Sequence, residues 1–213
     1  MNVTEIYRFH SHAAPGHLLV LGLVGSMDIC GCQYFWFCHQ PLFCRRKDPG
    51  LLVEGSQFWQ HPNPEKWDKT LSSLLGLAGG LIPLAAGLDA GFGPSPEFGL
   101  GLKIIAIAVL LLGYIIGSYA LIANQFFLGM VGIQAERGHY VIDTGPYRWV
   151  RHPGYLGGLI TYPVVPLLLE SWWTFIPAIF AIIIIVLRTK KEDDVLQEKL
   201  EGYREHAQRV RYG

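Results

Sequence analysis

The sequence of 213 residues is poor in charge and in cysteine. Asp, Glu, Lys and Arg together make up 16% of it, against roughly 25% in a typical soluble domain. Four cysteines are too few for a disulfide scaffold. Basic and acidic residues number 17 each, which does not indicate a nucleic-acid-binding protein. Apolar residues make up 51% of the chain, which excludes a disordered protein and leaves a compact apolar protein or an integral membrane protein.

Apolar residues are concentrated in five stretches that are candidates for membrane spans. They cover residues 18–38, 70–90, 99–123, 154–169 and 171–187. The third stretch has no charge after Lys103 and exceeds the roughly 20 apolar residues that a bilayer core requires. Only Glu170 and Ser171 separate the last two, which predicts a tight helical hairpin. The predicted fold class is all-α, an integral membrane helical bundle of about five transmembrane helices with a C-terminal hairpin.

The positions of the basic residues support this arrangement. Five spans would place residues 39–69, 124–153 and 188–213 on one side of the membrane. These segments hold every Lys and Arg except Arg8 and Lys103, and positive charge collects on the cytosolic side. We therefore expect a multi-pass membrane protein with a cytosolic C-terminus, in the endoplasmic reticulum of a eukaryote or the inner membrane of a bacterium. If the first stretch only lies in the interface, the other four keep their orientation.

Four cysteines and a histidine are close together near the first stretch. Cys30, Cys32, Cys38 and Cys44 are accompanied by His39. Their spacings are C-x-C and C-x5-C, whereas zinc sites usually contain paired C-x2-C or H-x3-H motifs. We interpret these cysteines as small polarizable side chains in or beside a membrane helix, and we expect no metal ion.

The most informative polar stretch is residues 134–155, QAERGHYVIDTGPYRWVRHPGY, in the loop before the final hairpin. Residues 144–147, TGPY, predict a turn. His152 precedes Pro153, so its backbone is expected to leave helical geometry. Gly154 would allow close approach of the backbone to a ligand. The next helix should start at about this glycine and point its free N–H groups toward the loop, which favours an anion there.

A second charged stretch, residues 188–212, follows the last apolar stretch. Arg188 and Glu192 are four residues apart, so both project from one helix face. Taken alone, this stretch is typical of an amphipathic helix that rests on anionic lipid headgroups. In that case Asp193 would only keep the helix surface solvated. The hairpin brings it back beside the RHPGY residues. The two segments together predict a polar pocket at the cytosolic rim, with aromatic, histidine, arginine and carboxylate groups.

The sequence GPYRWVRHPGYLG, a short hairpin, and then R-x3-E-D-x2-L resemble the isoprenylcysteine carboxyl methyltransferases. Phospholipid N-methyltransferases share this pattern. The resemblance extends from Asp48 to the end, so residues 48–213 are expected to form a membrane methyltransferase domain. Residues 1–47 are expected to form an N-terminal segment with the first span. The resemblance implies S-adenosylmethionine as the cofactor, and the lipid bilayer and an apolar, prenyl- or lipid-like methyl acceptor as partners.

The resemblance also implies residue roles. The residues implied to bind the cofactor are Gln134, His139, Tyr140, Val141, Ile142, Tyr147, His152, Pro153, Gly154, Tyr155 and Glu192. Glu192 would bind the amino-acid or ribose end of the cofactor, and Arg188 would be the catalytic residue that faces the acceptor. An acceptor carboxylate, most readily that of a prenylated cysteine, is ionised at neutral pH and needs no general base. It needs a cation to orient it, and the guanidinium of Arg188 offers a bidentate fork.

Other functions compatible with the sequence are a phospholipid or thiol methyltransferase, an NADPH-dependent sterol-type reductase and a non-catalytic membrane protein. The reductases resemble RHPNYxGE, whereas this chain has Gly154 and Gly158 at the Asn and Glu positions. His206 stands where the family often has Tyr, and the chain ends at Gly213 without the usual tail, which motivates the non-catalytic reading. The oligomeric state stays open, because a GxxxG-like face at Gly113 and Gly117 suits internal packing as well as dimerisation.

Overall fold

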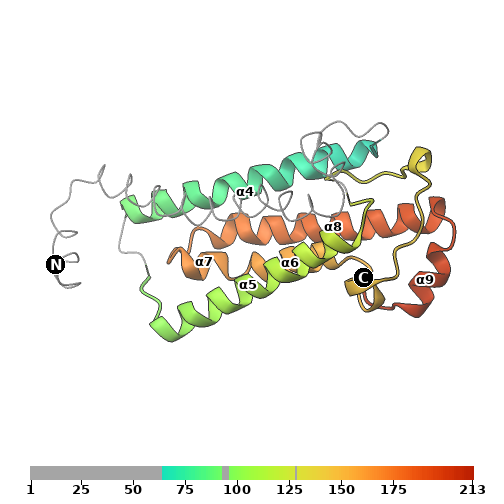
Figure 1. Cartoon of the computed structure of the whole chain (residues 1–213). Helices are drawn as coiled ribbons and strands as arrows, with labels where there is room; N and C mark the ends of the chain where they lie inside the picture. Colours follow the sequence, from blue (N-terminus) through green and yellow to red (C-terminus); the bar gives the residue numbers. More distant parts are fainter. Residues whose placement is uncertain (1–63, 93–95, 128) are drawn as a thin grey trace.

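The computed structural model describes residues 64–92, 96–127 and 129–213 (Figure 1). Within these ranges the regular structure is helical and contains no strand. The elements are α4 (Lys66–Phe92), α5 (Leu100–Ala123), the 3₁₀ turns η1 (Ala135–Arg137) and η2 (Gly145–Arg148), α6 (Pro153–Thr161), α7 (Val165–Leu168), α8 (Phe175–Lys199) and α9 (Tyr203–Arg209). The predicted all-α class is therefore confirmed for this part. The stretch 18–38, the cysteine cluster and the domain boundary at residue 48 lie outside it.

Two helices of the described ranges are long and apolar enough to cross a membrane. They are α4, with 27 residues, and α5, with 24, which at about 1.5 Å per residue reach the thickness of a bilayer core. Many of their large apolar side chains face outward, among them Leu77, Leu84, Ile104, Ile105 and Ile115. An apolar outer surface on such helices is what lipid contact requires. These helices cover the predicted stretches 70–90 and 99–123.

The stretch 154–169 differs from its prediction as one thin span. It forms two short helices, α6 and α7, with a break after Thr161. The break has a local cause, because Pro163 lies between them and Pro166 lies in the first turn of α7, where a missing N–H group costs nothing. The stretch 171–187 belongs to the single helix α8, which continues without interruption into the charged segment up to Lys199.

The chain turns back at Glu170, where the sequence predicted a hairpin. This residue has a positive φ of 50°. Its carboxylate accepts a hydrogen bond from the Phe98 N–H group (3.1 Å) and pairs with Lys103 Nζ (2.7 Å). The hairpin tip is thereby fixed to the start of α5, and α8 returns alongside α4 (Figure 1).

Glycines set the closest helix contact, between α5 and α6. A Cβ atom at Gly157 would lie 2.7 Å from the carbonyl oxygen of Gly113 and 3.0 Å from the backbone nitrogen of Gly117. Side chains larger than hydrogen are therefore excluded at Gly157. The GxxxG-like face of α5 is used here for packing within the chain.

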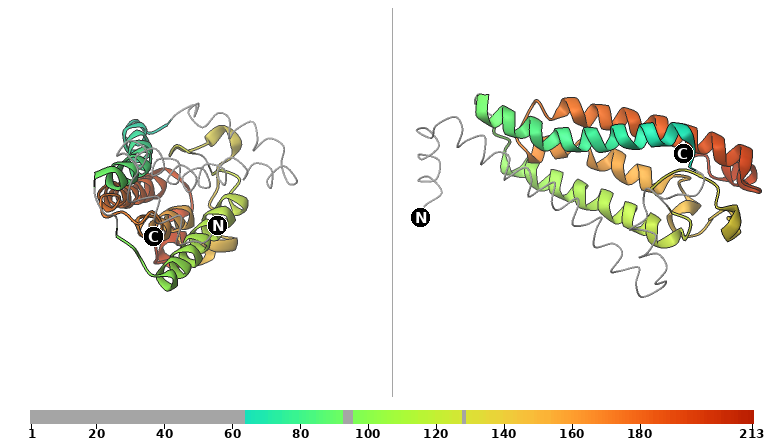
Figure 2. Two further views of the ribbon diagram at one scale, coloured as in Figure 1. Left: turned by 90° about the vertical axis from the view of Figure 1, so that its left-hand side faces the viewer. Right: turned by 90° about the horizontal axis from the view of Figure 1, so that it is seen from above.

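One end of the bundle collects the loops and the charge. The long connection from α5 to α6, the C-terminal part of α8 and α9 all lie at this end (Figures 1 and 2). Of the described Lys and Arg residues, only Lys103 lies at the opposite end, beside the α7–α8 turn. This loop end is where α8 changes from apolar to charged, and it contains the candidate site.

Candidate functional site

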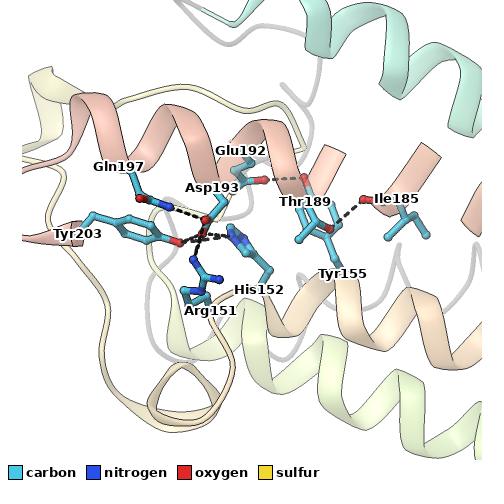
Figure 3. Close-up of polar contacts among 9 residues, drawn as sticks. All are labelled: Arg151, His152, Tyr155, Ile185, Thr189, Glu192, Asp193, Gln197 and Tyr203. Carbon is cyan, nitrogen blue, oxygen red and sulfur yellow. Dashed lines mark hydrogen bonds and ion pairs between the residues drawn. The ribbon is translucent and has the colours of Figure 1, made fainter. Parts of the chain in front are cut away.

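Asp193 on α8 is the centre of a polar cluster (Figure 3). Arg151 Nη1 donates to its Oδ1 and Oδ2 at 2.7 and 2.6 Å, and His152 Nε2 lies 3.1 Å from Oδ1. The Tyr203 hydroxyl donates to Oδ1 at 2.8 Å, and Gln197 Nε2 to Oδ2 at 2.6 Å. One carboxylate therefore joins the loop before α6, α8 and α9.

The cluster fixes the charge of its members. Burial raises the pKa of Asp193, but hydrogen bonds from His152 and Tyr203 and the positive charge of Arg151 outweigh it, so the pKa lies well below its usual range. Burial, and then the negative charge of Asp193, raise the pKa of Tyr203 well above its usual value. At neutral pH the carboxylate is ionised and the phenol is protonated, which is the combination that their hydrogen bond needs.

A second cluster surrounds Arg188, about one turn earlier on α8. Its Nε and Nη2 donate to Oδ1 and Oδ2 of Asp68 on α4, at 2.6 and 3.1 Å. Its guanidinium carbon lies 5.4 Å from the ring centroid of Tyr155 on α6, within cation–π range. The Tyr155 hydroxyl in turn donates to Glu192 Oε2 at 2.6 Å. A continuous line of contacts thus runs from Asp68 through Arg188 and Tyr155 to Glu192.

Local sequence explains how α6 presents these side chains. Pro153 is the first residue of the helix, and the preceding His152 has φ −126° and ψ 64°, outside helical geometry as predicted. The Arg151–His152 pair consequently faces Asp193, while Tyr155 in the first helical turn reaches Glu192. Gly154 is a position of close approach, because a Cβ there would lie 2.9 Å from the ring of Phe127.

Tyr147 on η2 belongs to the same end of the bundle. Its hydroxyl accepts a hydrogen bond from Asn124 Nδ2 at 3.3 Å, and the ring is buried. Burial raises the pKa of Tyr147, the bond from Asn124 offsets part of the rise, and the negative charge of Glu192 adds to it. Tyr147 therefore lies within electrostatic reach of Glu192.

The other predicted cofactor residues form a neighbouring group around Phe126. His139 stacks on the Phe126 ring with centroids 4.4 Å apart, and Tyr140 meets it edge-on at 5.1 Å. Gln134 Nε2 donates to the Phe126 carbonyl at 2.7 Å. Val141 approaches Gly202 in the α8–α9 turn, and Ile142 beside it is half-buried.

The structure thus divides the predicted site residues into two groups. One consists of Tyr147, His152, Pro153, Gly154, Tyr155, Arg188 and Glu192, and the other of Gln134, His139 and Tyr140, with Val141 and Ile142 toward the α8–α9 turn. Their roles in binding stay predictions.

Sequence reasoning missed Asp68 and left Asp193 out of the predicted site residues. Asp193 lies about 100° around α8 from Glu192 and so faces a different set of partners, which a residue that only solvates the helix would lack. The sequence held a signal for Asp68, because it is an acidic residue two positions before the predicted apolar stretch 70–90. The structure places it in the first turn of α4 and buries it fully. In the described ranges no three His, Cys, Asp or Glu side chains are grouped as metal ligands.

Two comparisons relate parts of this chain to known proteins. The model of the isoprenylcysteine carboxyl methyltransferase (ICMT) family matches residues 105–198, from α5 through nearly all of α8. The chain is also 32% identical over 62 residues to the uncharacterized protein YpbQ of Bacillus subtilis (strain 168), a match that covers 29% of this chain. The matched part spans 37% of that protein, little more than a third of its length. Over residues 105–198, the chain is similar to the isoprenylcysteine carboxyl methyltransferase family.

Proposed function

We propose that this chain is a membrane methyltransferase that moves the methyl group of S-adenosylmethionine to the carboxylate of an apolar acceptor, such as a prenylated cysteine. The observation that carries the proposal is the contact between Tyr155 and Glu192. It joins the RHPGY loop to the R-x3-E helix inside the segment that matches the family. Methyl transfer is an in-line displacement, so the work of the protein is to position two reactants and exclude water.

The residues present fit the polar parts of the cofactor. Glu192 uses Oε2 for Tyr155, while no described residue donates a hydrogen bond to its Oε1, so that oxygen can accept from a ligand ammonium. The aromatic faces of Tyr147 and Tyr155 suit an adenine or a cationic sulfur. S-adenosylmethionine, when bound, supplies an activated methyl group. The chain holds the polar ends of the molecule and keeps Glu192 oriented through the Tyr155 hydroxyl.

Arg188 is proposed to orient the acceptor carboxylate through one nitrogen, and not through the bidentate fork that the sequence predicted. Its Nε–Nη2 edge is directed to Asp68, and Nη2 also donates to the Gly129 carbonyl at 2.8 Å. Among the described residues Nη1 has no partner. One nitrogen rather than two is therefore left for an acceptor oxygen, which favours positioning over tight binding.

The apolar surfaces support an acceptor that enters from the bilayer. Exposed Leu and Ile side chains cover α5, and those of α8 include Ile176, Ile179 and Ile183. The basic residues gather at the loop end, which supports the proposed cytosolic orientation of the C-terminus. A polar cofactor at that end and a prenyl chain among the helices would meet near Arg188. The membrane is that of the endoplasmic reticulum or the bacterial inner membrane, according to the host.

The cofactor is tested by calorimetric titration of the purified protein in detergent with S-adenosylhomocysteine, with NADPH as the competing ligand. We expect micromolar binding of the former, lost in Glu192→Ala and kept in Glu198→Ala, an exposed glutamate of the same helix. Binding of NADPH alone would favour the reductase. A folded protein that binds neither would favour the non-catalytic alternative.

The acceptor is tested separately by methyl transfer. The protein in lipid nanodiscs is given S-adenosylmethionine and N-acetyl-S-farnesylcysteine, and ester formation is measured. The carboxamide of the same compound is the matched control, because it keeps the prenyl chain but lacks the carboxylate nucleophile. Cofactor binding without esterification, but with methylation of a phospholipid amine or a thiol, would assign the chain to those acceptors instead.

A further inference from the structure

Asp68 is the most completely buried charged side chain of the described part, with 0% of its surface exposed. It lies in the first turn of α4, and its carboxylate accepts three hydrogen bonds. Two come from Arg188, and the third comes from the Val131 N–H group at 2.7 Å. Both oxygens are engaged and the side chain is shielded from solvent, so Asp68 is not accessible to a cofactor or an acceptor itself.

Arg188, the ion-pair partner of Asp68, is held in place by groups on more than one side. Arg188 is 7% exposed, and its contacts with Asp68 and with the Gly129 carbonyl use Nε and Nη2. The Tyr155 ring lies over its guanidinium carbon. Fixing two nitrogens of a planar group fixes the third, so the position of Nη1 is determined by groups from α4, α6 and the loop after α5.

We propose that Asp68 is a positioning residue for methyl transfer, which fixes Arg188 and neutralises its charge so that Nη1 orients the acceptor carboxylate without trapping it. The inference rests on the proposed function for the existence of that acceptor. The inference also specifies the acceptor further. Its carboxylate receives one charge-assisted hydrogen bond, from an ion pair that is neutral overall.

The reason lies in how charge changes during the reaction. An acceptor carboxylate is negative before methylation and neutral as an ester, while the cofactor sulfur loses its positive charge. An uncompensated cation beside the carboxylate would stabilise the ground state more than the transition state, and that raises the barrier. The Asp68–Arg188 pair carries no net charge, so it can orient the acceptor carboxylate with little stabilisation of the ground state and little increase of the barrier.

Changing Asp68 to Asn removes the compensating charge while keeping the size of the side chain. We expect Asp68→Asn to bind N-acetyl-S-farnesylcysteine about ten-fold more tightly, and its carboxamide with unchanged affinity. The kcat should fall by about ten-fold, so KM and kcat decrease together. Asp68→Glu keeps the charge and should restore an affinity near that of the wild type.

The matched control is Ser72→Ala, one turn along the same face of α4. Ser72 is buried and its hydroxyl has no hydrogen-bond partner among the described residues, so its loss should change neither constant. Thermal unfolding of each variant shows whether the helices still pack. A purely structural role of Asp68 predicts weaker binding of carboxylate and carboxamide alike, and that result would overturn the inference.

A second variant covers the case in which Asp68→Asn does not fold. Arg188→Lys presents a single ammonium, which Asp68 would capture, so preference for the carboxylate over the carboxamide should disappear. Full retention of that preference would contradict the positioning role. The binding readout also separates this inference from the proposed function. Carboxylate preference with the Asp68→Asn shift, but no ester, supports the role of the Asp68–Arg188 pair in orienting a bound carboxylate and refutes the proposed methyl transfer. A wild-type protein that esterifies the acceptor without the shift in Asp68→Asn refutes only the inference.

Discussion

Replacing Asp193 by Ala tests whether one carboxylate holds the loop end together. The change removes the hydrogen bonds from Arg151, Tyr203 and Gln197 and the contact with His152. It leaves the Arg151 guanidinium with no counterion among the described residues, and the Nε atom of the same side chain is already buried without a partner there. We expect the loop before α6 and helix α9 to lose their common anchor, while α4 and α5 stay unaffected.

The size of the effect follows from exposure. The Arg151 and Asp193 side chains are 17% and 15% exposed. The pair thus lies between surface pairs, which contribute about 0–1 kcal/mol, and buried pairs, whose disruption costs about 3–5 kcal/mol. Hydrogen bonds to a charged group contribute about 1.5–3 kcal/mol each but are not additive. We expect a loss of about 3 kcal/mol, or roughly 6–12 °C in the melting temperature of a chain of this size.

The assay is thermal unfolding in detergent as a function of pH, with Asp194→Ala as control. Asp194 is the adjacent exposed carboxylate, and its replacement should change stability by less than about 0.5 kcal/mol. The pKa of Asp193 is lower in the folded than in the unfolded protein, so its stabilisation is present above about pH 4 and is lost as the pH falls further. The gap between wild type and Asp193→Ala should therefore shrink below pH 4. Equal melting temperatures of the two alanine variants at pH 7 would refute the reasoning.

Two further predictions concern α6. Gly157→Ala places a methyl group 2.7 Å from a backbone oxygen of α5 and should lower the free energy of unfolding by about 1–3 kcal/mol. Gly117→Ala should be tolerated, because no described residue outside α5 lies within 4 Å of its Cβ position. Chemical denaturation of both variants checks this. Tyr155→Phe removes the hydroxyl that donates to Glu192 and should weaken S-adenosylhomocysteine binding by about 2- to 10-fold in calorimetry. Unchanged affinity would show that this hydrogen bond does not hold Glu192 for the cofactor.

Much of the helical framework could be predicted from the sequence because apolar runs and breakers act locally. The runs that became α4 and α5 contain few charges, and Glu170 with Ser171 interrupts the apolar sequence where the chain turns. The hairpin also predicted that the RHPGY loop and the R-x3-E helix would meet, as Tyr155 and Glu192 do. The break inside 154–169 was predictable too, because prolines mark it.

The long-range partners could not be predicted, because no spacing rule relates them. Arg188 and Asp68 are 120 positions apart, and their pairing depends on how α4 and α8 are rotated about their axes. The direction of the Arg188 fork depends on that partner. The same limit applies to Asp193, whose neighbours come from a loop and from α9.

The position of Asp68 outside the family-matched segment has a consequence for that segment. Residues 105–198 contain Arg188, Tyr155 and Glu192 but not the carboxylate that balances the guanidinium. A buried guanidinium left with neither a counterion nor an acceptor for its Nε costs several kcal/mol, so the matched segment alone could not keep Arg188 in this position. Either α4 supplies a side-chain oxygen that holds the guanidinium, or Arg188 leaves the site and takes the orienting nitrogen with it. The site is therefore a product of α4, α6 and α8 together.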